Sequence, residues 1–269
     1  DNSYRQKESK AVTVAFELTQ TPSFISQLLP GKKIAKTSLL AWTTTPWTLP
    51  SNLALAVNCE IDYIAVWRDD LVVIMAQSLL AKYDKELGLA ESQLSDSFKG
   101  QELVGLTYQP LYHFLADHYA EILNSAFQIL PADFVTTEEG TGIVHLAPAF
   151  GEDDQNLCKA YNIPTLCPVD DAGNFSEPIK AYLGQHVFAA NEQIIKDLKK
   201  AGAWLKTEQY LHNYPHCWRT DTPLIYKAMP SWYVKVTAFK DRMVELNQQI
   251  NRLPDHIKDG QFGKWLANA

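Results

Sequence analysis

A run of three threonines meets a proline-bounded turn directly after an apolar segment, in the stretch AWTTTPWTLPSN at 41–52. The preceding residues, SLLAW at 38–42, predict a strand. Thr45 before Pro46 is typical of a helix N-cap with proline at the first helical position, and Pro50 limits this helix to about one turn. So short a helix leaves backbone N–H groups without partners, which predicts hydroxyls and free amides at a strand end. In the alternative interpretation, the threonines satisfy only their own backbone.

A second stretch, GTGIVHLAPAFGEDD at 140–154, predicts a strand followed by a turn and a helix. Apolar residues at 143–146 favour the strand, and the proline and glycine that follow favour the turn. Acidic residues at 152–154 open the expected helix, where their charge suits the helix dipole. The dipole does not account for a histidine at the strand end. We therefore expect His145 and Asp154 to converge across the turn on one small cleft.

Together the two stretches resemble the editing domain of isoleucyl-tRNA synthetase, the connective-polypeptide insertion that interrupts the catalytic domain of that enzyme. They stand in the family's order and near the family's separation, whereas the relatives that act on valine and leucine differ in detail. The resemblance covers nearly the whole chain, including HCWRTDTPLIYKAMPSWY at 216–233 and INRLPDHIKDGQFGKWLANA at 250–269, which look like the segment returning to the catalytic core. No HIGH-type or KMSKS-type sequence for amino-acid activation occurs, so we expect an excised part of a longer enzyme.

The resemblance implies an aminoacyl-tRNA ester hydrolase that removes valine wrongly attached to the terminal adenosine of isoleucine tRNA, with valyl adenylate as a further candidate substrate. It implies that Asp154 pairs with the α-ammonium of the substrate and that His145 bounds the side-chain pocket. The threonines would hold the carbonyl, ribose or water, and Asn52 is a candidate for a polar contact near the adenosine. For Trp47 we favour packing in the core over stacking. The predicted site residues are Thr45, His145 and Asp154 as catalytic and Thr43, Thr44, Trp47, Thr48 and Asn52 as substrate-binding.

Two other classes of function stay open at this point. One is a metal-dependent hydrolase that uses His145 with the acids at 152–154, and the other is a non-catalytic module that binds an RNA end. The chain has no GxSxG elbow and no Cys/His nucleophile signature, which disfavours a covalent mechanism. Its four cysteines show no CxxC spacing, and His216 beside Cys217 does not make a recognised zinc pattern. We therefore predict reduced thiols, no structural metal and no cofactor.

The charge of the chain limits its partners. A formal net charge of −7 disfavours a broad basic face, because non-specific nucleic-acid binding depends on many phosphate contacts. We expect the chain to contact only the 3′ end of aminoacylated tRNA(Ile), while the remainder of the parent synthetase binds the tRNA body. No run of about eighteen apolar residues occurs, and the chain begins with the polar DNSYRQKESK, so we expect no membrane contact and a cytoplasmic location.

The pattern of apolar residues predicts a β-rich α+β fold in which strands outnumber a few peripheral helices. Nearly half of the 269 residues are apolar, which is enough for a sizeable core. The family resemblance, and not the periodicity, implies a closed or nearly closed barrel. The expected elements are strands at 11–18, 53–57, 63–67 and 71–76, a turn at 68–70, and helices at 77–87 and 191–200.

The composition also suggests where the chain divides. Residues 1–10 are polar and predict a linker end. A lysine-rich helix end and a glycine close the regular pattern near residue 203. We place the editing domain at 1–203 and a connecting segment, returning toward an absent catalytic core, at 204–269.

Overall fold

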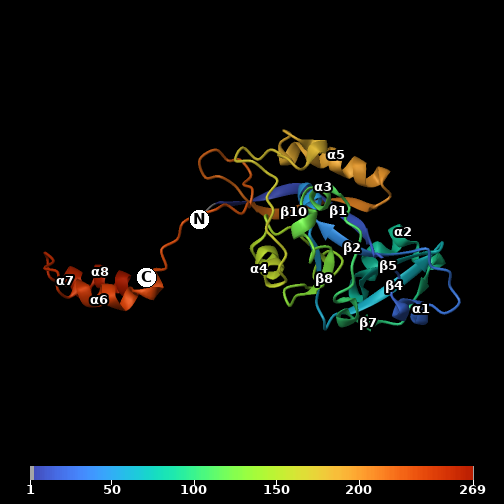
Figure 1. Ribbon diagram of the computed structural model, residues 1–269, viewed down its shortest axis with the longest axis horizontal. Helices are drawn as coiled ribbons and strands as arrows, with labels where there is room; N and C mark the ends of the chain where they lie inside the picture. The colour runs from blue at the N-terminus through green and yellow to red at the C-terminus, as the bar shows by residue number, and fades with distance from the viewer. Residues whose placement is uncertain (1–2, 269) are drawn as a thin grey trace. The chain divides into compact units, whose positions relative to one another are not determined.

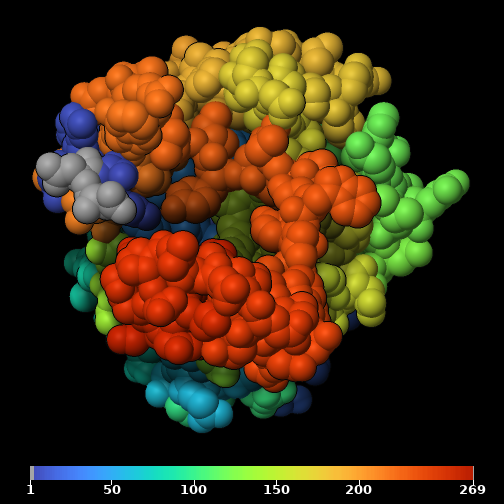
Figure 2. Space-filling model, turned by 90° about the vertical axis from the view of Figure 1, so that its left-hand side faces the viewer, coloured from blue at the N-terminus to red at the C-terminus, as the bar shows by residue number. Residues whose placement is uncertain are grey.

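The computed structural model describes residues 3–268 (Figure 1). The chain divides into two compact units, of which the first ends at Ala228 and the second begins at Met229. Every residue of the predicted site lies in the first unit. The second unit contains η7 (Val236–Ala238), α6 (Lys240–Asn247), α7 (His256–Asp259) and α8 (Gln261–Ala267). Within it, α8 packs against both α6 and α7. The residues of this unit are orange-red to red in Figure 2.

The larger sheet of the first unit contains seven strands. They are β1 (Tyr4–Glu17), β2 (Lys36–Thr43), β4 (Asp62–Arg68), β5 (Leu71–Ala76), β6 (Gln93–Leu94), β7 (Phe98–Lys99) and β10 (Trp204–Pro215). Their order is β10-β1-β2-β5-β4-β6, with β7 also paired to β4. All pairs are antiparallel except β2 with β5. The predicted turn at 68–70 is confirmed, because Asp69 and Asp70 adopt the positive φ angles, 50° and 63°, that tight hairpin loops favour.

The smaller sheet brings the two stretches that stand out in the sequence side by side. It consists of β8 (Gln128–Pro131), β3 (Ala54–Val57) and β9 (Val144–Leu146), in the order β8-β3-β9. The fully buried β3 follows the threonine turn, and β9 contains His145. Their antiparallel register places Leu55 opposite His145. The register therefore fixes which side chain of β9 lies beside the threonine turn.

Of the expected closed or nearly closed barrel, the closed form is not found within residues 3–268. Strands β10 and β6 end the order of the larger sheet and are not paired with each other. Isolated bridges instead join Leu18 to Tyr108 and Thr107 to Gln128. Hydrogen bonding at the end of β1 therefore continues toward the smaller sheet and does not turn back to β6. The β-rich α+β class itself is confirmed.

Short helices surround the sheets, and only α5 is long. The helical elements of the first unit are α1 (Ser23–Leu28), α2 (Asp84–Leu87), α3 (Phe114–His118), α4 (Glu152–Ala160) and α5 (Val187–Lys200), with the 3₁₀ segments η1 (Pro46–Ser51), η2 (Gln77–Tyr83), η3 (Leu89–Glu91), η4 (Gly100–Leu103), η5 (Ala120–Ile122) and η6 (Lys180–Tyr182). The helix predicted at 191–200 is confirmed as part of α5, whose apolar face is buried against the rest of the first unit. Helix α5 packs on η1 and β10 (Figure 1). None of the helices within 3–268 is long and apolar enough to cross a membrane.

The polar start of the chain differs from the expected linker end. From Tyr4 onward these residues belong to β1 and pair with β10, with Tyr4 opposite Pro215 and Lys10 opposite Gln209. Asp1 and Asn2 lie outside the described residues. Backbone hydrogen bonds hold such a ribbon and need no apolar side chains, so a polar sequence does not indicate the strand. The compact units divide after Ala228, whereas the functional boundary at 203/204 stays a prediction.

We predict that a chain ending at Ala228 unfolds cooperatively and that a chain ending at residue 203 is strongly destabilised. The shorter chain lacks β10, so residues 4–14 of β1 lose their partner and β1 becomes an exposed edge. We expect a loss of more than about 3 kcal/mol in the free energy of unfolding. Urea unfolding followed by tryptophan fluorescence measures this loss. Equal midpoints for the two chains would show that β10 is dispensable to the fold.

Candidate functional site

The threonine turn joins β2 to η1. Strand β2 ends at Thr43, and Thr45 occupies the predicted cap position before Pro46. The Thr45 side chain makes no capping bond, and its Oγ1 lies 3.2 Å from Thr43 Oγ1 and 3.3 Å from Thr48 Oγ1. Thr43 Oγ1 accepts the Thr45 N–H at 3.1 Å, and Thr48 Oγ1 donates to the Thr45 carbonyl at 2.8 Å. Of the three hydroxyls, only that of Thr45 makes no backbone bond within residues 3–268.

His145 joins this turn to β9. Its Nε2 lies 2.8 Å from Thr48 Oγ1, and its Nδ1 lies 3.2 Å from Asn52 Nδ2. The imidazole is 8% exposed, so both contacts are formed away from water. Two hydrogen bonds at opposite corners of the ring fix its orientation. The second stretch therefore meets the threonine turn at His145, whereas the expected convergence of His145 with Asp154 on one cleft stays a prediction.

Asn52 is itself held in one orientation. Its Oδ1 accepts the Tyr108 hydroxyl at 2.6 Å, and its Nδ2 donates to the Ala54 carbonyl at 2.8 Å. Asn52 is buried, and its amide supports His145. The predicted contact of Asn52 with an adenosine stays a prediction. Tyr108 is not among the predicted site residues, because a tyrosine in an extended segment carries no signal of the partner of its hydroxyl.

The hydrogen-bond partners define the protonation of the ring. Burial lowers the pKa of His145 to about 4, so the imidazole is neutral at pH 7. The Asn52 amide nitrogen is a donor, which assigns the acceptor role to Nδ1 and the ring proton to Nε2. His145 Nε2–H then donates to Thr48 Oγ1, which donates in turn to the Thr45 carbonyl. Because Asn52 occupies the one lone pair of the ring, His145 cannot accept a proton from water in this arrangement.

Asp154 lies in the first turn of α4, as predicted. Its Oδ2 accepts the backbone N–H of Ala147 at 2.8 Å, just beyond the end of β9. Burial raises its pKa to about 6, although the Ala147 hydrogen bond acts in the opposite direction. Gly151 permits this close packing, because a Cβ there would lie 2.8 Å from Asp154 Cγ. The result is a partly buried carboxylate whose charge is incompletely compensated.

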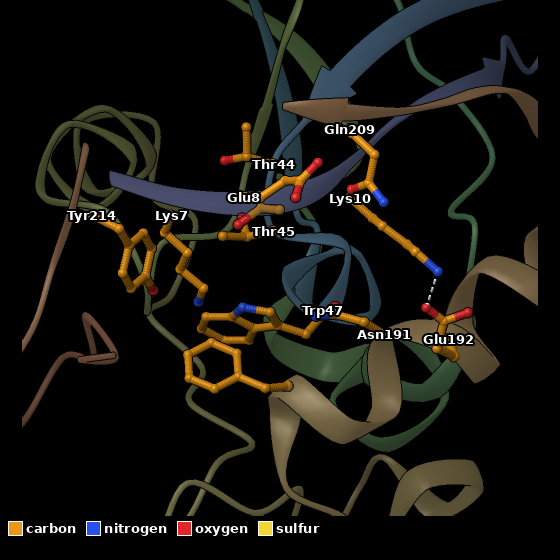
Figure 3. A pocket seen from close by; sticks show the side chains of 12 residues that line it. Lys7, Glu8, Lys10, Thr44, Thr45, Trp47, Asn191, Glu192, Gln209 and Tyr214 are labelled. Atoms are coloured by element: carbon orange, nitrogen blue, oxygen red, sulfur yellow. Dashed lines mark hydrogen bonds and ion pairs between the residues drawn. The ribbon is translucent and has the colours of Figure 1, made fainter. Parts of the chain in front are cut away.

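Thr44 and Trp47 line a cleft of about 370 Å³ together with Thr45 (Figure 3). Trp47 is 2% exposed and packs edge-on against Phe150 and Phe188, with ring centroids 4.8 Å and 6.3 Å away. Its ring therefore belongs to the core, which is the favoured prediction. Among residues 3–268 its Nε1 nevertheless has no hydrogen-bond partner.

The predicted site residues fall into three groups. One hydrogen-bonded network contains Thr43, Thr45, Thr48, Asn52 and His145. Thr44 and Trp47 line the neighbouring cleft. Asp154 is tied to the network only through the backbone of Ala147, two positions beyond His145, and in the described part of the chain it makes no direct bond to the threonines.

The residues of the alternative metal site, His145 and the acids at 152–154, do not form a metal-binding cluster in the described part of the chain. Within residues 3–268 no group of three or more His, Cys, Asp and Glu side chains is placed to hold a metal ion. His145 already uses both ring nitrogens on Thr48 and Asn52. All four cysteines are free thiols, and burial raises the pKa of Cys158 to about 12.

Comparison with known sequences identifies the family. The sequence model of the tRNA synthetases class I (I, L, M and V) matches residues 6–269. The chain belongs to this family. It is 55% identical over its full length to an isoleucine–tRNA ligase of Rickettsia felis and 54% identical to one of Rickettsia prowazekii. The chain spans 25% of the length of each of these class I synthetases.

Solved structures resemble this class I synthetase chain in fold. A crystal structure of GlLeuRS-CP1 superposes with a TM-score of 0.56 at 17% identity, covering 74% of this chain and 98% of that one. The editing domain of the cytosolic leucyl-tRNA synthetase of P. knowlesi superposes with a TM-score of 0.54 at 16% identity, covering 77% of this chain and 97% of that one. The fold is thus that of editing domains of class I synthetases.

We predict that Asp154→Asn stabilises this class I synthetase chain at neutral pH. An acid whose pKa is raised in the folded protein stabilises the fold below its unfolded value, here 3.8, and loses that contribution as the pH rises to about 6. Above this window the partly buried carboxylate costs on the order of 2 kcal/mol, which the neutral amide avoids.

Urea unfolding between pH 4 and pH 8 measures this difference. The gain from Asp154→Asn should grow as the pH rises from 4 to 6 and then stay constant. Asp117→Asn, at an exposed position in the first turn of α3, is the control and should show no such trend. A gain that is equal at all pH values would contradict the raised pKa of Asp154.

Proposed function

We propose that this chain is the editing part of an isoleucyl-tRNA synthetase and hydrolyses the ester between valine and the terminal adenosine of tRNA(Ile), with valyl adenylate as a second substrate. The observation that carries the proposal is the His145–Thr48 hydrogen bond, which unites both motif stretches in one network beside a cleft. Family membership and the editing-domain fold support the same reading. The partners are the 3′ end of the charged tRNA and the remainder of the parent synthetase.

The need for such an activity follows from the limits of apolar recognition. One methylene in an apolar pocket discriminates by only about 1–3 kcal/mol, a general magnitude for which isoleucyl-tRNA synthetase is itself the standard example. A synthetic site for isoleucine therefore also accepts valine. A second site that hydrolyses the smaller product restores accuracy.

The reaction requires a positioned water and no covalent intermediate. Water adds to the ester carbonyl, the bond from the carbonyl carbon to the ribose oxygen breaks, and a proton from water ends on that oxygen. The Thr45 hydroxyl borders the cleft and is free of backbone bonds in the described chain, so it is available to hold the water or the carbonyl oxygen. Thr43 and Thr48 fix Thr45, while Thr44 contributes to the same wall.

Asp154 supplies the charge that recognises an amino acid. Its carboxylate is destabilised by burial, which raises its pKa to about 6. The α-ammonium of the substrate would offset that cost through a charge-assisted hydrogen bond. The binding energy then depends on a free amino group, which every aminoacyl ester has and a simple nucleoside ester lacks.

His145 fits the role of a steric limit better than that of a general base. The alternative as base requires a free lone pair, and Asn52 occupies it. Isoleucine would gain about 0.8 kcal/mol from burial of its extra methylene, so attraction cannot reject it. A ring fixed at both nitrogens can reject it, since overpacking a rigid site costs about 1–3 kcal/mol.

Release of free valine from Val-tRNA(Ile) tests the proposal. We predict that the chain releases valine, with a high KM because its net charge of −7 disfavours tRNA binding. Asp154→Ala should lower kcat/KM by about 100-fold or more, because the ammonium loses its counter-charge. Asp153→Ala, one position away and exposed, is the matched control and should stay within about twofold.

Other outcomes of this assay point to the alternatives. Normal hydrolysis by the Asp154→Ala variant would remove Asp154 from the site. RNA-end binding without valine release would favour the binding module. Loss of activity on chelation, with stoichiometric metal in the purified chain, would favour the metal-dependent hydrolase.

We predict that His145→Ala hydrolyses Ile-tRNA(Ile) as well as Val-tRNA(Ile), because removal of the ring opens space for the larger side chain. Deacylation rates on the two esters measure this change. Val144→Ala, which removes methyl groups from the opposite face of β9, is the matched control and should keep the selectivity for valine. Loss of both activities in a folded His145→Ala variant would assign His145 a catalytic role instead.

A further inference from the structure

Residues 224–228 run along the first unit without regular secondary structure, and we call them the strap. The strap is attached to β10, where the Tyr214 hydroxyl donates to the Leu224 carbonyl at 2.8 Å. At its other end the Ala228 N–H donates to the Ala149 carbonyl at 2.7 Å. Because the strap belongs to neither a helix nor a sheet, individual contacts of this kind determine its path.

The strap supports the tight turn that connects β9 to α4, and Ala149 lies within that turn. The Phe150 N–H donates to the Ala147 carbonyl at 2.8 Å and closes the turn, while the Ala147 N–H donates to Asp154 Oδ2 at 2.8 Å. The cavity between the strap and the turn measures about 160 Å³, which is below the range of small-ligand sites, about 300–1,000 Å³. The strap is therefore a support for the turn that positions Asp154 and not the wall of a ligand site.

One side chain ties the strap to the rest of the unit. Lys227 Nζ donates to the carbonyls of Val169 and Asp170, at 3.2 Å and 2.9 Å, and pairs with Asp171 Oδ1 at 2.8 Å. An ammonium has three donors, and each of them has a partner here. The Asp171 side chain is 89% exposed, so the ion pair by itself contributes little. The Lys227 side chain is only 14% exposed, and the two carbonyl bonds determine where its ammonium lies.

We propose that Lys227 is a positioning residue for the editing reaction, which holds the strap and, through it, the turn that positions the Asp154 carboxylate. The inference rests on the proposed function, in which Asp154 pairs with the α-ammonium of the substrate. Lys227 acts through the turn and does not itself touch the substrate. Without its Lys227 contacts the strap is free to leave Ala149, and the turn loses that support. A displacement of about 1 Å in a group that orients a substrate can cost about 100-fold in rate.

The test compares Val-tRNA(Ile) with 2-hydroxyisovaleryl-tRNA(Ile), in which a hydroxyl replaces the α-ammonium. Each rate is taken relative to the uncatalysed hydrolysis of the same ester. The wild-type chain should prefer the valyl ester in kcat/KM, because only that ester has the charge that pairs with Asp154. Lys227→Met should reduce this preference by about tenfold, since a misplaced carboxylate loses its charge-assisted bond. A merely structural defect would slow both esters alike and leave their ratio unchanged.

Two milder variants at the same position test the hydrogen bonds. Lys227→Arg keeps a cation with several donors, so the preference should stay within about twofold of the wild-type value. Lys227→Gln keeps an N–H donor but no charge, and the preference should fall by about threefold.

Lys99→Met is the matched control. Lys99 Nζ also donates to a carbonyl, that of Glu60 at 2.8 Å, and pairs with a carboxylate, that of Asp62 at 3.0 Å. It lies on β7 and contacts neither the strap nor the turn, as far as the described residues show. Its removal should leave the preference for the valyl ester unchanged.

Hydrogen exchange at the Ala147 N–H gives a readout that needs no substrate, because this group donates to Asp154. The exchange should be about tenfold faster in Lys227→Met than in the wild-type chain, since the turn opens more often. Amides within the β4–β5 pair should exchange at the wild-type rate, which shows that the variant is folded.

The outcomes separate this inference from the proposed function. If the wild-type chain hydrolyses neither ester, the editing proposal fails. If it hydrolyses Val-tRNA(Ile) and its preference survives in both Lys227→Met and Lys227→Gln, the positioning role of Lys227 is overturned while editing stands. An equal fall in Lys227→Met and Lys227→Arg would also overturn that role, because the bonds from a cation at this position would then make no difference.

Discussion

The hydrogen bond between His145 Nε2 and Thr48 Oγ1, 2.8 Å long, joins two segments that are 97 positions apart in the chain. It forms only because β3 and β9 pair in one register, with Leu55 opposite His145. A slip of one residue would turn the imidazole to the other face of the sheet and present an aliphatic side chain in its place. The order Tyr108, Asn52, His145, Thr48, Thr45 satisfies each buried polar group in turn. Removal of Asn52, His145 or Thr48 leaves a buried polar group without its hydrogen-bond partner, so the stability of each bond in the network depends on the others.

The sequence predicts those parts of the fold in which burial dictates the residue pattern. Strands β3, β4 and β5 are apolar because at least one face of each is buried, and their positions were predictable. The first part of β1 is polar because it pairs through the backbone and exposes its side chains. The closed or nearly closed barrel was inferred from resemblance alone, and within residues 3–268 the order of the larger sheet does not close.

The same distinction applies to the candidate site. The strand before the threonines and the proline after Thr45 predict a turn, so the threonine cluster was predictable from local sequence. Tyr108 reaches Asn52 across 56 positions, and no local pattern encodes that contact. The cleft could not be predicted for a similar reason. Its lysines, Lys7 and Lys10, lie in a segment that resembles a linker, and its far wall comes from α5.

The ribbon of β1 and β10 has a consequence for how this unit is connected to other polypeptide. Tyr4 lies opposite Pro215, so these two ends of the ribbon lie on adjacent strands, about 5 Å apart. Polypeptide that precedes Tyr4 and follows Pro215 is therefore held at nearly one point. The ribbon is then a short, two-stranded stalk, and the stalk also forms one wall of the cleft. Twisting of the β1–β10 ribbon would move this wall of the cleft together with the rest of the unit.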